Sequence, residues 1–475
     1  MASTVAEIRV PFHGEGSGSG ELTWGQRGIW NTIQRTGRTM NIGGVMPLPE
    51  GTPVGEIAGV LQFAVSRHQA LRTRLQVDAD RASGVPPRQT VSESGETVLH
   101  VVDVDEGDDP ADAAEELRSR YETTAFDQAR EWPVRMGVVR KGGTLTHLVV
   151  QYSHVAVDGL GIDAIARDLA HRDPQSNRPT APVSGMQPLQ IARAQAGPAG
   201  RRQSDKALRY WESQLATVPA RRFAASADPR EPRFWELFCY SPAMHLAMRS
   251  ISARTGAHNS HVLLAAYAVA LARVTRRTPS LAQVVVSNRF RPGFADAVTQ
   301  LSQTGICVID VADCVFDDVV ARAWKAAAGA YMHGYYEPGA HQSLLDEISR
   351  RRGEELDLSC FVNDRRVPAP DEPPPTEDEL RAALPRTRLR WDRKQPIFDG
   401  AFFLQVDSAP DANVPGRLIP EEQQQPAVYF AIWADTLALA PRDIEACARE
   451  LEAVTIEAAF DGKAPTRVGP WSGAE

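Results

Sequence analysis

The sequence predicts a mixed α/β protein built from two halves of similar make-up. The chain has 475 residues, more than one hydrophobic core usually supports, so two domains are expected. Helical and strand patterns alternate along both halves. Residues 173–204 are rich in Pro, Ser, Gln and Gly, which indicates a linker. We therefore expect a first half over residues 21–180, a linker over 181–206 and a second half over 207–475.

The elements of the first half follow from periodicity and capping signals. Residues 1–20 end in GEGSGSG, which is typical of a flexible tail. Thr52 fits the cap and Pro53 the first turn of a helix whose apolar stripe runs over residues 57–65. The remaining predictions are a strand over 96–104, an acidic helical stretch from residue 108, a strand over 144–152 and a helix over 162–172.

The second half shows the same alternation. Helices are predicted over residues 262–276 and 441–460, and the apolar stripe of the last helix holds Ile444, Cys447, Ala448, Leu451 and Val454. Strands are predicted over 282–288, 305–311, 358–364, 401–407 and 427–433. The proline-rich residues 367–385 are expected to form an exposed excursion.

Composition excludes several classes of function. The net charge is −8, and no Lys/Arg stripe with interleaved aromatics occurs, which argues against nucleic acid as a partner. The best apolar run, residues 262–272, is shorter than the roughly 20 residues of a membrane-spanning helix, and the N-terminus lacks a secretion signal. Five scattered cysteines without a C-x-x-C pair favour buried thiols in a reducing cytoplasm. We expect a cytoplasmic monomer with no metal site.

The stretch YSHVAVDG, residues 152–159, carries the candidate chemistry. His154 follows a predicted strand and precedes a predicted helix, so it sits on a short, rigid turn. Gly159 leaves room for a ligand, and the N–H groups of the following helix face developing negative charge. Asp158 either orients the imidazole or pairs with an arginine. A packed or surface histidine is the competing interpretation, and it is the one adopted for His100, His147, His171, His245, His258, His261, His333 and His341.

Other motifs favour the catalytic interpretation. The stretches LTWGQRGIW (22–30), RHQALRTRL (67–75) and VVVSNRFRP (284–292) resemble core motifs of the condensation domains of nonribosomal peptide synthetases, in the same order. SHVAVDG matches the family's H-H-x-x-x-D-G signature except at the first position, where this chain has Ser153. ALRYWESQL (207–215) and YFAIWADTLAL (429–439) resemble later regions of that family.

The resemblance implies a fold and an activity. The implied fold is a pseudo-dimer of two chloramphenicol acetyltransferase-like halves in a V, with a tunnel between them. The implied enzyme is a free-standing acyltransferase of natural-product biosynthesis. It joins an acyl or aminoacyl donor, held as a phosphopantetheine thioester on a carrier protein, to an amine or hydroxyl acceptor. The product is an amide or an ester, and no cofactor is permanently bound.

The resemblance also implies residue roles. His154 would be the catalytic residue, positioning or deprotonating the acceptor, and backbone N–H groups near Gly159 would bind the oxyanion. Asp158 would be structural, with Arg289 as its partner, and Ser153 would replace a supporting histidine. Arg67, His68 and Arg72 would be architectural.

Two points rest on the residues rather than on the family. Ser302, Thr304 and Asn363 are polar candidates for substrate binding near strand ends. A Ser153 nucleophile is disfavoured, since neighbours on a strand point to opposite faces and no G-x-S-x-G elbow occurs.

Two further functions stay open. The first is an O-acyltransferase that makes lipid or polyketide esters from coenzyme A or carrier thioesters. The second is a degenerate, non-catalytic domain that binds carrier proteins or another partner. Ser153 favours this last alternative, whereas the intact His154, Asp158 and Gly159 argue against it.

Overall fold

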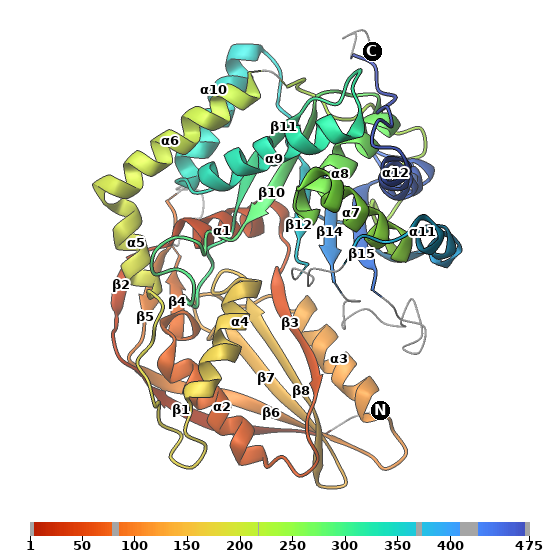
Figure 1. Cartoon of the computed structure of the whole chain (residues 1–475). Helices are drawn as coiled ribbons and strands as arrows, with labels where there is room; N and C mark the ends of the chain where they lie inside the picture. Colours follow the sequence, from red (N-terminus) through yellow and green to blue (C-terminus); the bar gives the residue numbers. More distant parts are fainter. Residues whose placement is uncertain (1–3, 78–84, 217, 367–372, 409–425, 471–475) are drawn as a thin grey trace. The chain divides into compact units, whose positions relative to one another are not determined.

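The chain forms two compact units, each built around its own β-sheet (Figure 1). The computed structural model describes residues 4–77, 85–216, 218–366, 373–408 and 426–470. Unit 1 comprises residues 1–202 and 287–303, and unit 2 comprises residues 203–286 and 304–475. The predicted mixed α/β class is confirmed.

Unit 1 contains the strands and helices of the N-terminal part of the chain. In order they are β1 (Thr4–His13), β2 (Gly18–Glu21), α1 (Trp24–Thr36), β3 (Asn41–Pro47), α2 (Val54–Arg67), η1 (Gln69–Arg72), β4 (Thr73–Gln76), β5 (Arg88–Val91), β6 (Ser94–Val104), α3 (Pro110–Thr123), β7 (Val134–Lys141), β8 (Thr144–Ser153), α4 (Gly159–Asp168), η3 (Leu169–His171) and α5 (Pro188–Ala196).

The main sheet of unit 1 has the order β1-β6-β7-β8-β3. Only the β6–β7 pair is parallel among its neighbours. Side chains alternate across the sheet: Val101, Val138 and Val150 pack with α2 and α4 on one face, whereas Val102, Val139 and Val149 pack with α3 on the other. A second, three-stranded sheet has the order β2-β5-β4. The sheet core therefore fixes β8 and α4, which flank the candidate motif.

Helix α6 (Pro198–Leu215) leads from unit 1 into unit 2. The elements that follow are β9 (Phe234–Ser241), α7 (Pro242–Thr255), α8 (Asn259–Thr275), β10 (Ser280–Val286), β11 (Gln303–Ile309), α9 (Phe316–His333), α10 (Pro338–Arg352), β12 (Cys360–Asp364), α11 (Glu377–Ala383), η4 (Leu384–Arg386), β13 (Arg388–Gln395), β14 (Phe402–Asp407), β15 (Val428–Asp435) and α12 (Pro441–Phe460).

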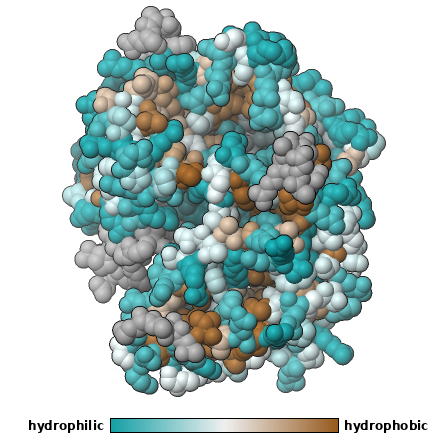
Figure 2. All heavy atoms as spheres, turned by 180° about the vertical axis from the view of Figure 1, so that it is seen from behind, coloured by the Kyte–Doolittle hydropathy of each residue, from teal (hydrophilic) through white to brown (hydrophobic). Residues whose placement is uncertain are grey.

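The sheet of unit 2 has seven strands in the order β11-β10-β12-β14-β15-β9-β13. Helix α8 is its central packing element, because its residues 262–272 are all buried. The predicted stripe of α12, from Ile444 to Val454, is buried in the same core. On the face of the molecule shown in Figure 2, hydrophilic side chains predominate and hydrophobic ones form small groups. Among the described residues, no helix combines the length and apolar character needed to cross a membrane.

The prediction of a flexible tail over residues 1–20 was wrong for the residues that the structure describes. Residues 4–13 form β1, which pairs with β6 along its whole length, and residues 18–21 form β2. The glycine-rich segment between them is held by Arg72, which is fully buried. Its guanidinium donates hydrogen bonds to the carbonyls of Glu15, Gly16 (2.7 Å) and Ser92 (2.5 Å). Composition alone could not reveal these long-range hydrogen bonds from Arg72.

The domain boundaries differ from the expected ones. Residues 287–303 fold with unit 1, because Arg289 and the backbone near Ser302 bind Asp158. The expected linker over 181–206 contains α5 and the start of α6. Leu189 and Ile191 of α5 are buried, and Gln195 accepts a hydrogen bond from the backbone of Trp24. These contacts turn a polar-looking segment into a packed one.

Three further predictions are corrected in detail. Thr52 does not cap α2: Pro53 is the residue before the helix, and the Thr52 hydroxyl donates to the Pro49 carbonyl at 2.7 Å. Helix α4 begins at Gly159 rather than residue 162, because Asp158 caps it. The expected excursion over 367–385 includes α11, in which Leu380 is buried; its residues 367–372 lie outside the described chain.

Candidate active site

The YSHVAVDG stretch forms the turn between β8 and α4. The carbonyl of Ser153, the last residue of β8, accepts hydrogen bonds from the N–H groups of Ala156 (2.9 Å) and Val157 (3.3 Å). The His154 N–H donates to the Met40 carbonyl at 3.1 Å, which ties the turn to the residue before β3. His154 therefore sits on a backbone that is hydrogen-bonded on both sides.

The imidazole of His154 is held in one orientation. Its Nδ1 lies 2.9 Å from the Val157 carbonyl oxygen, which can only accept, so Nδ1 carries the proton and donates. In the neutral ring, Nε2 is then the basic nitrogen. Burial lowers the pKa of His154 below 6.5, although the Val157 carbonyl and the Asp158 charge oppose this shift. The residue as a whole is half-buried, and the acceptor nitrogen of its neutral ring is Nε2.

Asp158 does not orient the imidazole but anchors the turn. Its side chain is 3% exposed and binds Arg289 Nη2 through Oδ1 at 2.6 Å. The same oxygen accepts the Gly161 N–H at 2.8 Å, the N-cap bond of α4. Oδ2 accepts from the backbone N–H groups of Leu301 (3.0 Å) and Ser302 (3.1 Å) and from the Ser302 hydroxyl (3.0 Å). The predicted ion pair between Asp158 and Arg289 is present.

Arg289 extends this anchor through the loop over residues 288–302. Its Nη1 donates to the carbonyls of Ala297 (2.6 Å) and Phe294 (3.2 Å), and its Nη2 also reaches the Thr299 carbonyl at 3.3 Å. The preceding residue, Asn288, is buried with a positive φ of 59°, and its amide donates to the Leu301 carbonyl at 3.1 Å. One arginine thus shapes the loop that supplies the donors to Asp158.

The burial and hydrogen bonds of Ser153 do not fit a nucleophile. Its side chain is fully buried, and its hydroxyl pairs with the side-chain amide of Gln128, at 2.8 Å from Nε2 and 3.1 Å from Oε1. The imidazole Nδ1 of His154 is bonded to Val157 instead. Sequence reasoning missed Gln128, because a lone amide in a loop carries no recognisable signal.

The two glycines of the motif have different requirements. A Cβ added to Gly159 would meet nothing within 4 Å, so space beside the first residue of α4 is open. A Cβ at Gly161 would lie 2.5 Å from Val157 Cγ2 and 3.2 Å from Arg289 Nη2. Gly161 is therefore required by close packing, whereas Gly159 lies at the positive end of the helix dipole with open space beside it.

The first motif supports the same loop. Thr23 caps α1 in a capping box with Gln26, and its hydroxyl also reaches the Gln300 carbonyl at 3.2 Å. A Cβ at Gly25 would lie 2.5 Å from that carbonyl oxygen. The motif LTWGQ is thus explained by a helix start that packs tightly against the residues preceding Leu301.

The RHQALR motif fixes the other end of α4. Asp168, the last residue of α4, binds the guanidinium of Arg67 and accepts from His68 Nε2 at 3.1 Å. All three side chains are at most 12% exposed. Burial by itself raises the pKa of Asp168, but the bonds from His68 and Arg67 outweigh it and hold the pKa well below 3.8. These contacts agree with the architectural role expected for Arg67, His68 and Arg72.

The three nominated substrate-binding residues fall in different places. Ser302 binds Asp158 and so belongs to the anchor of the turn. Thr304 belongs to unit 2, where its hydroxyl lies 2.8 Å from Gln283 Oε1 and 3.2 Å from the Tyr336 hydroxyl. Asn363 also belongs to unit 2, on β12 next to Gln405 of β14. The structure brings Ser153, His154, Asp158, Gly159, Arg289 and Ser302 together in unit 1.

Within the described chain, no three His, Cys, Asp or Glu residues form a group that could hold a metal ion. His258 accepts the Ser260 N–H and caps α8. The five cysteines are free, and burial raises the pKa of the Cys360 thiol to about 12.

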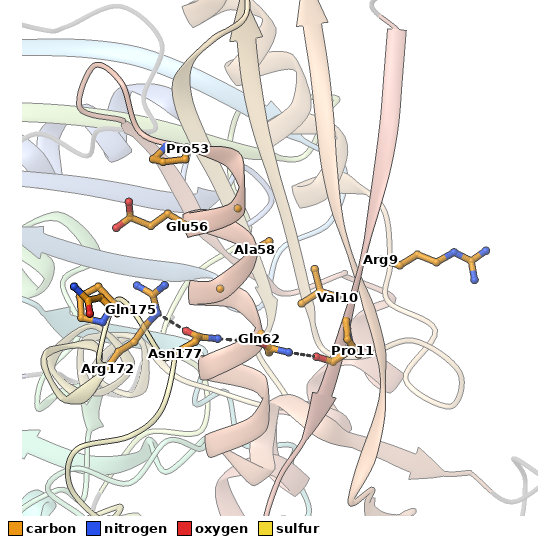
Figure 3. Close-up of a pocket in the computed structure, with 13 residues that line it drawn as sticks. Arg9, Val10, Pro11, Pro53, Glu56, Ala58, Gln62, Arg172, Gln175 and Asn177 are labelled. Atoms are coloured by element: carbon orange, nitrogen blue, oxygen red, sulfur yellow. Dashed lines mark hydrogen bonds between the residues drawn. The ribbon is translucent and has the colours of Figure 1, made fainter.

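A pocket in unit 1 lies beside α2 and contains no residue of the 153–161 turn (Figure 3). Its cavity volume is about 540 Å³. Its polar side chains bind one another in a chain: Arg172 Nε donates to Asn177 (2.5 Å), Asn177 to Gln62 (2.8 Å), and Gln62 to the Pro11 carbonyl (2.8 Å). These bonds join α2, β1 and the segment after α4, so these polar side chains hold the elements of unit 1 together.

The family model of the condensation domain matches residues 18–350. The chain belongs to the condensation domain family.

Relatives of this condensation domain occur in far longer proteins. It is 27% identical over 334 residues to the probable non-canonical nonribosomal peptide synthetase CymA of Salinispora arenicola. The match covers 66% of this chain but only 4% of CymA.

Solved structures show the same fold as this condensation domain. The X-domain from teicoplanin biosynthesis has a TM-score of 0.70 at 18% identity, with 95% of this chain and 97% of that one covered. The condensation domain of the monacolin K polyketide synthase MokA has a TM-score of 0.69 at 15% identity, with coverage of 95% and 100%.

Proposed function

We propose that this condensation domain catalyses acyl transfer from a carrier-bound thioester to an amine or hydroxyl acceptor in natural-product biosynthesis. The observation that carries the proposal is the state of His154. Its Nδ1 is bonded to the Val157 carbonyl, its pKa is lowered by burial, and space beside Gly159 is open. Membership of the condensation family supports the same reaction class.

The proposed chemistry is one nucleophilic substitution at the thioester carbonyl. The acceptor nitrogen or oxygen adds to the carbonyl carbon while His154 Nε2 accepts a hydrogen bond, or the proton, from that nucleophile. The tetrahedral intermediate collapses with cleavage of the C–S bond. The proton from the nucleophile finally resides on the departing thiol, so the step needs no oxidant, metal or second cofactor.

The start of α4 is the proposed site of oxyanion stabilisation. The first N–H groups of a helix have no partner within the helix, and they lie at the positive end of its dipole. Asp158 takes the N–H of Gly161, which leaves the open side of Gly159 to face the reacting carbonyl. Fixed donors of this kind typically contribute about 3 kcal/mol to transition-state stabilisation.

The donor is proposed to be a phosphopantetheine thioester on a carrier protein, so that the pantetheine arm arrives with the substrate. The O-acyltransferase alternative makes lipid or polyketide esters, and it takes the thioester from coenzyme A or from a carrier. The five free cysteines fit a reducing compartment, and we place the reaction in the cytoplasm.

The test is a donor comparison with the full chain. The protein is incubated with acyl-loaded carrier proteins or with the matching acyl coenzyme A thioesters, together with panels of amines and alcohols. Intact-mass spectrometry follows the acyl group. We expect carrier unloading that depends on both protein and acceptor. If the protein turns over coenzyme A thioesters but not carrier thioesters, the result contradicts the proposal and supports the O-acyltransferase alternative.

A partner-binding domain is the second candidate. It is favoured by similarity to the teicoplanin X-domain, since an X-domain from teicoplanin biosynthesis has been solved in complex with OxyB. The same assay decides between the two functions. If the wild-type chain binds the carrier but transfers no acyl group, whichever donor and acceptor are supplied, the result supports this candidate and contradicts catalysis.

A further inference from the structure

Ser153 stands at the one position of the SHVAVDG stretch that departs from the family signature. Ser153 is fully buried at the end of β8. Its hydroxyl accepts a hydrogen bond from Gln128 Nε2 at 2.8 Å and lies 3.1 Å from Gln128 Oε1. A buried hydroxyl without a partner costs about 1 to 3 kcal/mol, so this pairing holds Ser153 and Gln128 together.

The loop that carries Gln128 is itself fixed at several points. The Gln128 carbonyl accepts the Leu75 N–H at 2.7 Å, which ties the loop to β4. The Asp127 carbonyl accepts the N–H groups of Arg130 (3.0 Å) and Glu131 (2.8 Å). At the far end of the loop, the Pro133 carbonyl accepts the Ser153 N–H at 3.0 Å. Ser153 is thus held by both ends of the same loop, once by its backbone and once by its side chain.

A short chain of contacts leads from Ser153 to the imidazole. The Ser153 carbonyl accepts the N–H of Val157, and the Val157 carbonyl accepts Nδ1–H of His154. The acceptor that fixes the tautomer of His154 therefore belongs to a turn whose base is Ser153. A displacement of Ser153 moves the Val157 carbonyl relative to the imidazole.

We propose that Gln128 is a positioning residue for His154. Through its buried hydrogen bond to Ser153, the amide fixes the base of the 153–157 turn and with it the orientation and tautomer of the imidazole. The proposal deepens the proposed function and rests on it for its catalytic meaning. Gln128 touches neither the imidazole nor, in this scheme, the substrate.

The test combines spectroscopy with kinetics on the full chain. Ring-¹⁵N-labelled histidine reports the tautomer and the titration of each imidazole, and the His154→Gln spectrum identifies the His154 signals. Gln128→Met matches the side-chain length but removes the amide, whereas Gln128→Glu keeps an oxygen that accepts the Ser153 hydroxyl. Gln62→Met is the matched control, because it removes an amide bonded to the Pro11 carbonyl elsewhere in unit 1.

The expected result separates positioning from simple stability. Wild type and Gln128→Glu show one dominant Nδ1–H tautomer. Gln128→Met shows a mixture of tautomers and a kcat lowered about tenfold at nearly constant KM, because small misplacements of a reacting group are costly. Gln62→Met lowers the melting temperature and leaves the His154 signals unchanged.

The proposal is overturned if Gln128→Met lowers the melting temperature but leaves the His154 tautomer as in wild type. If that variant does not fold, Ser153→Ala gives the same test, since the partly exposed Gln128 amide can then reach water. The spectroscopic readout needs no substrate. If wild type is inactive but Gln128→Met shows the expected mixture of tautomers, the result contradicts the proposed function and not the positioning role.

Discussion

At the scale of single residues, His154 determines the pH dependence of the proposed reaction. Burial lowers its pKa below 6.5, so the ring is neutral above that pH. A neutral ring accepts from the nucleophile, whereas a protonated one does not. The lowered pKa therefore moves the acidic loss of activity to lower pH.

We predict that kcat/KM decreases on the acid side of its pH profile, and that the midpoint of this decrease lies below pH 6.5. The measurement is the rate of carrier unloading between pH 5 and 9, with carrier and acceptor held constant. A limb centred at or above pH 6.5 would show that His154 is not held as the structure indicates.

Asp158 illustrates a second residue-scale effect, the cost of an unpaired buried charge. The Asp158→Ala variant removes the only carboxylate that the described part of the structure places on the 9%-exposed Arg289 guanidinium, together with its hydrogen bonds from the Leu301 and Ser302 N–H groups. Removing one member of a buried ion pair costs about 3 to 5 kcal/mol. We expect a loss of that order in the free energy of unfolding, measured with urea.

Asp163→Ala is the matched control for this variant. Asp163 is an exposed carboxylate on the same helix, and its removal is expected to change stability by less than about 0.5 kcal/mol. Equal stability of the two variants would contradict the anchoring role of Asp158.

At the scale of elements, α4 is fixed at both ends by carboxylates. Asp158 caps its start and binds Arg289, and Asp168 closes its end on Arg67 and His68. The helix that carries the proposed oxyanion site is thus tied to α2 and to the 288–302 loop. This double attachment explains why two motifs far apart in the sequence accompany the HxxxDG turn.

The second attachment makes stability depend on pH. The pKa of Asp168 is held well below its unfolded value near 3.8. A lowered carboxyl pKa contributes stability that is fully present above the unfolded pKa and is lost as the pH falls toward the folded one. We predict that the difference in unfolding free energy between wild type and Asp168→Asn is constant above about pH 5 and shrinks below pH 4.

Urea unfolding of both proteins at pH 7, 5, 4 and 3 measures this difference. Titrations of groups that do not contact Asp168 cancel in the comparison, so the change between pH 5 and 3 reports Asp168 and its ion pairs with Arg67 and His68. A difference that grew as the pH fell would contradict the sign of the pKa shift.

At the scale of the whole molecule, the sequence predicted the class of fold and most elements well. Strand β6, helix α3, strand β8 and helix α12 form where the sequence pattern predicted them, and each buries apolar side chains. The ion pair between Asp158 and Arg289 was also predicted, through the resemblance of two motifs.

The failures share one physical cause, which is dependence on long-range partners. The glycine-rich segment is ordered by Arg72, and the expected linker is ordered by packing of Leu189 and Ile191. Gln128 likewise gains its role from a serine 25 residues away. Local sequence patterns report none of these contacts.

The central claim is that the Nε2 face of His154 carries acyl transfer. The most direct measurement is the single-turnover rate of acyl transfer from a loaded carrier by His154→Ala, compared with wild type and with Asp163→Ala. We predict a loss of about 100-fold or more for His154→Ala, in the range typical of removing a general base, with an unchanged melting temperature. Transfer by His154→Ala at the wild-type rate would contradict the account.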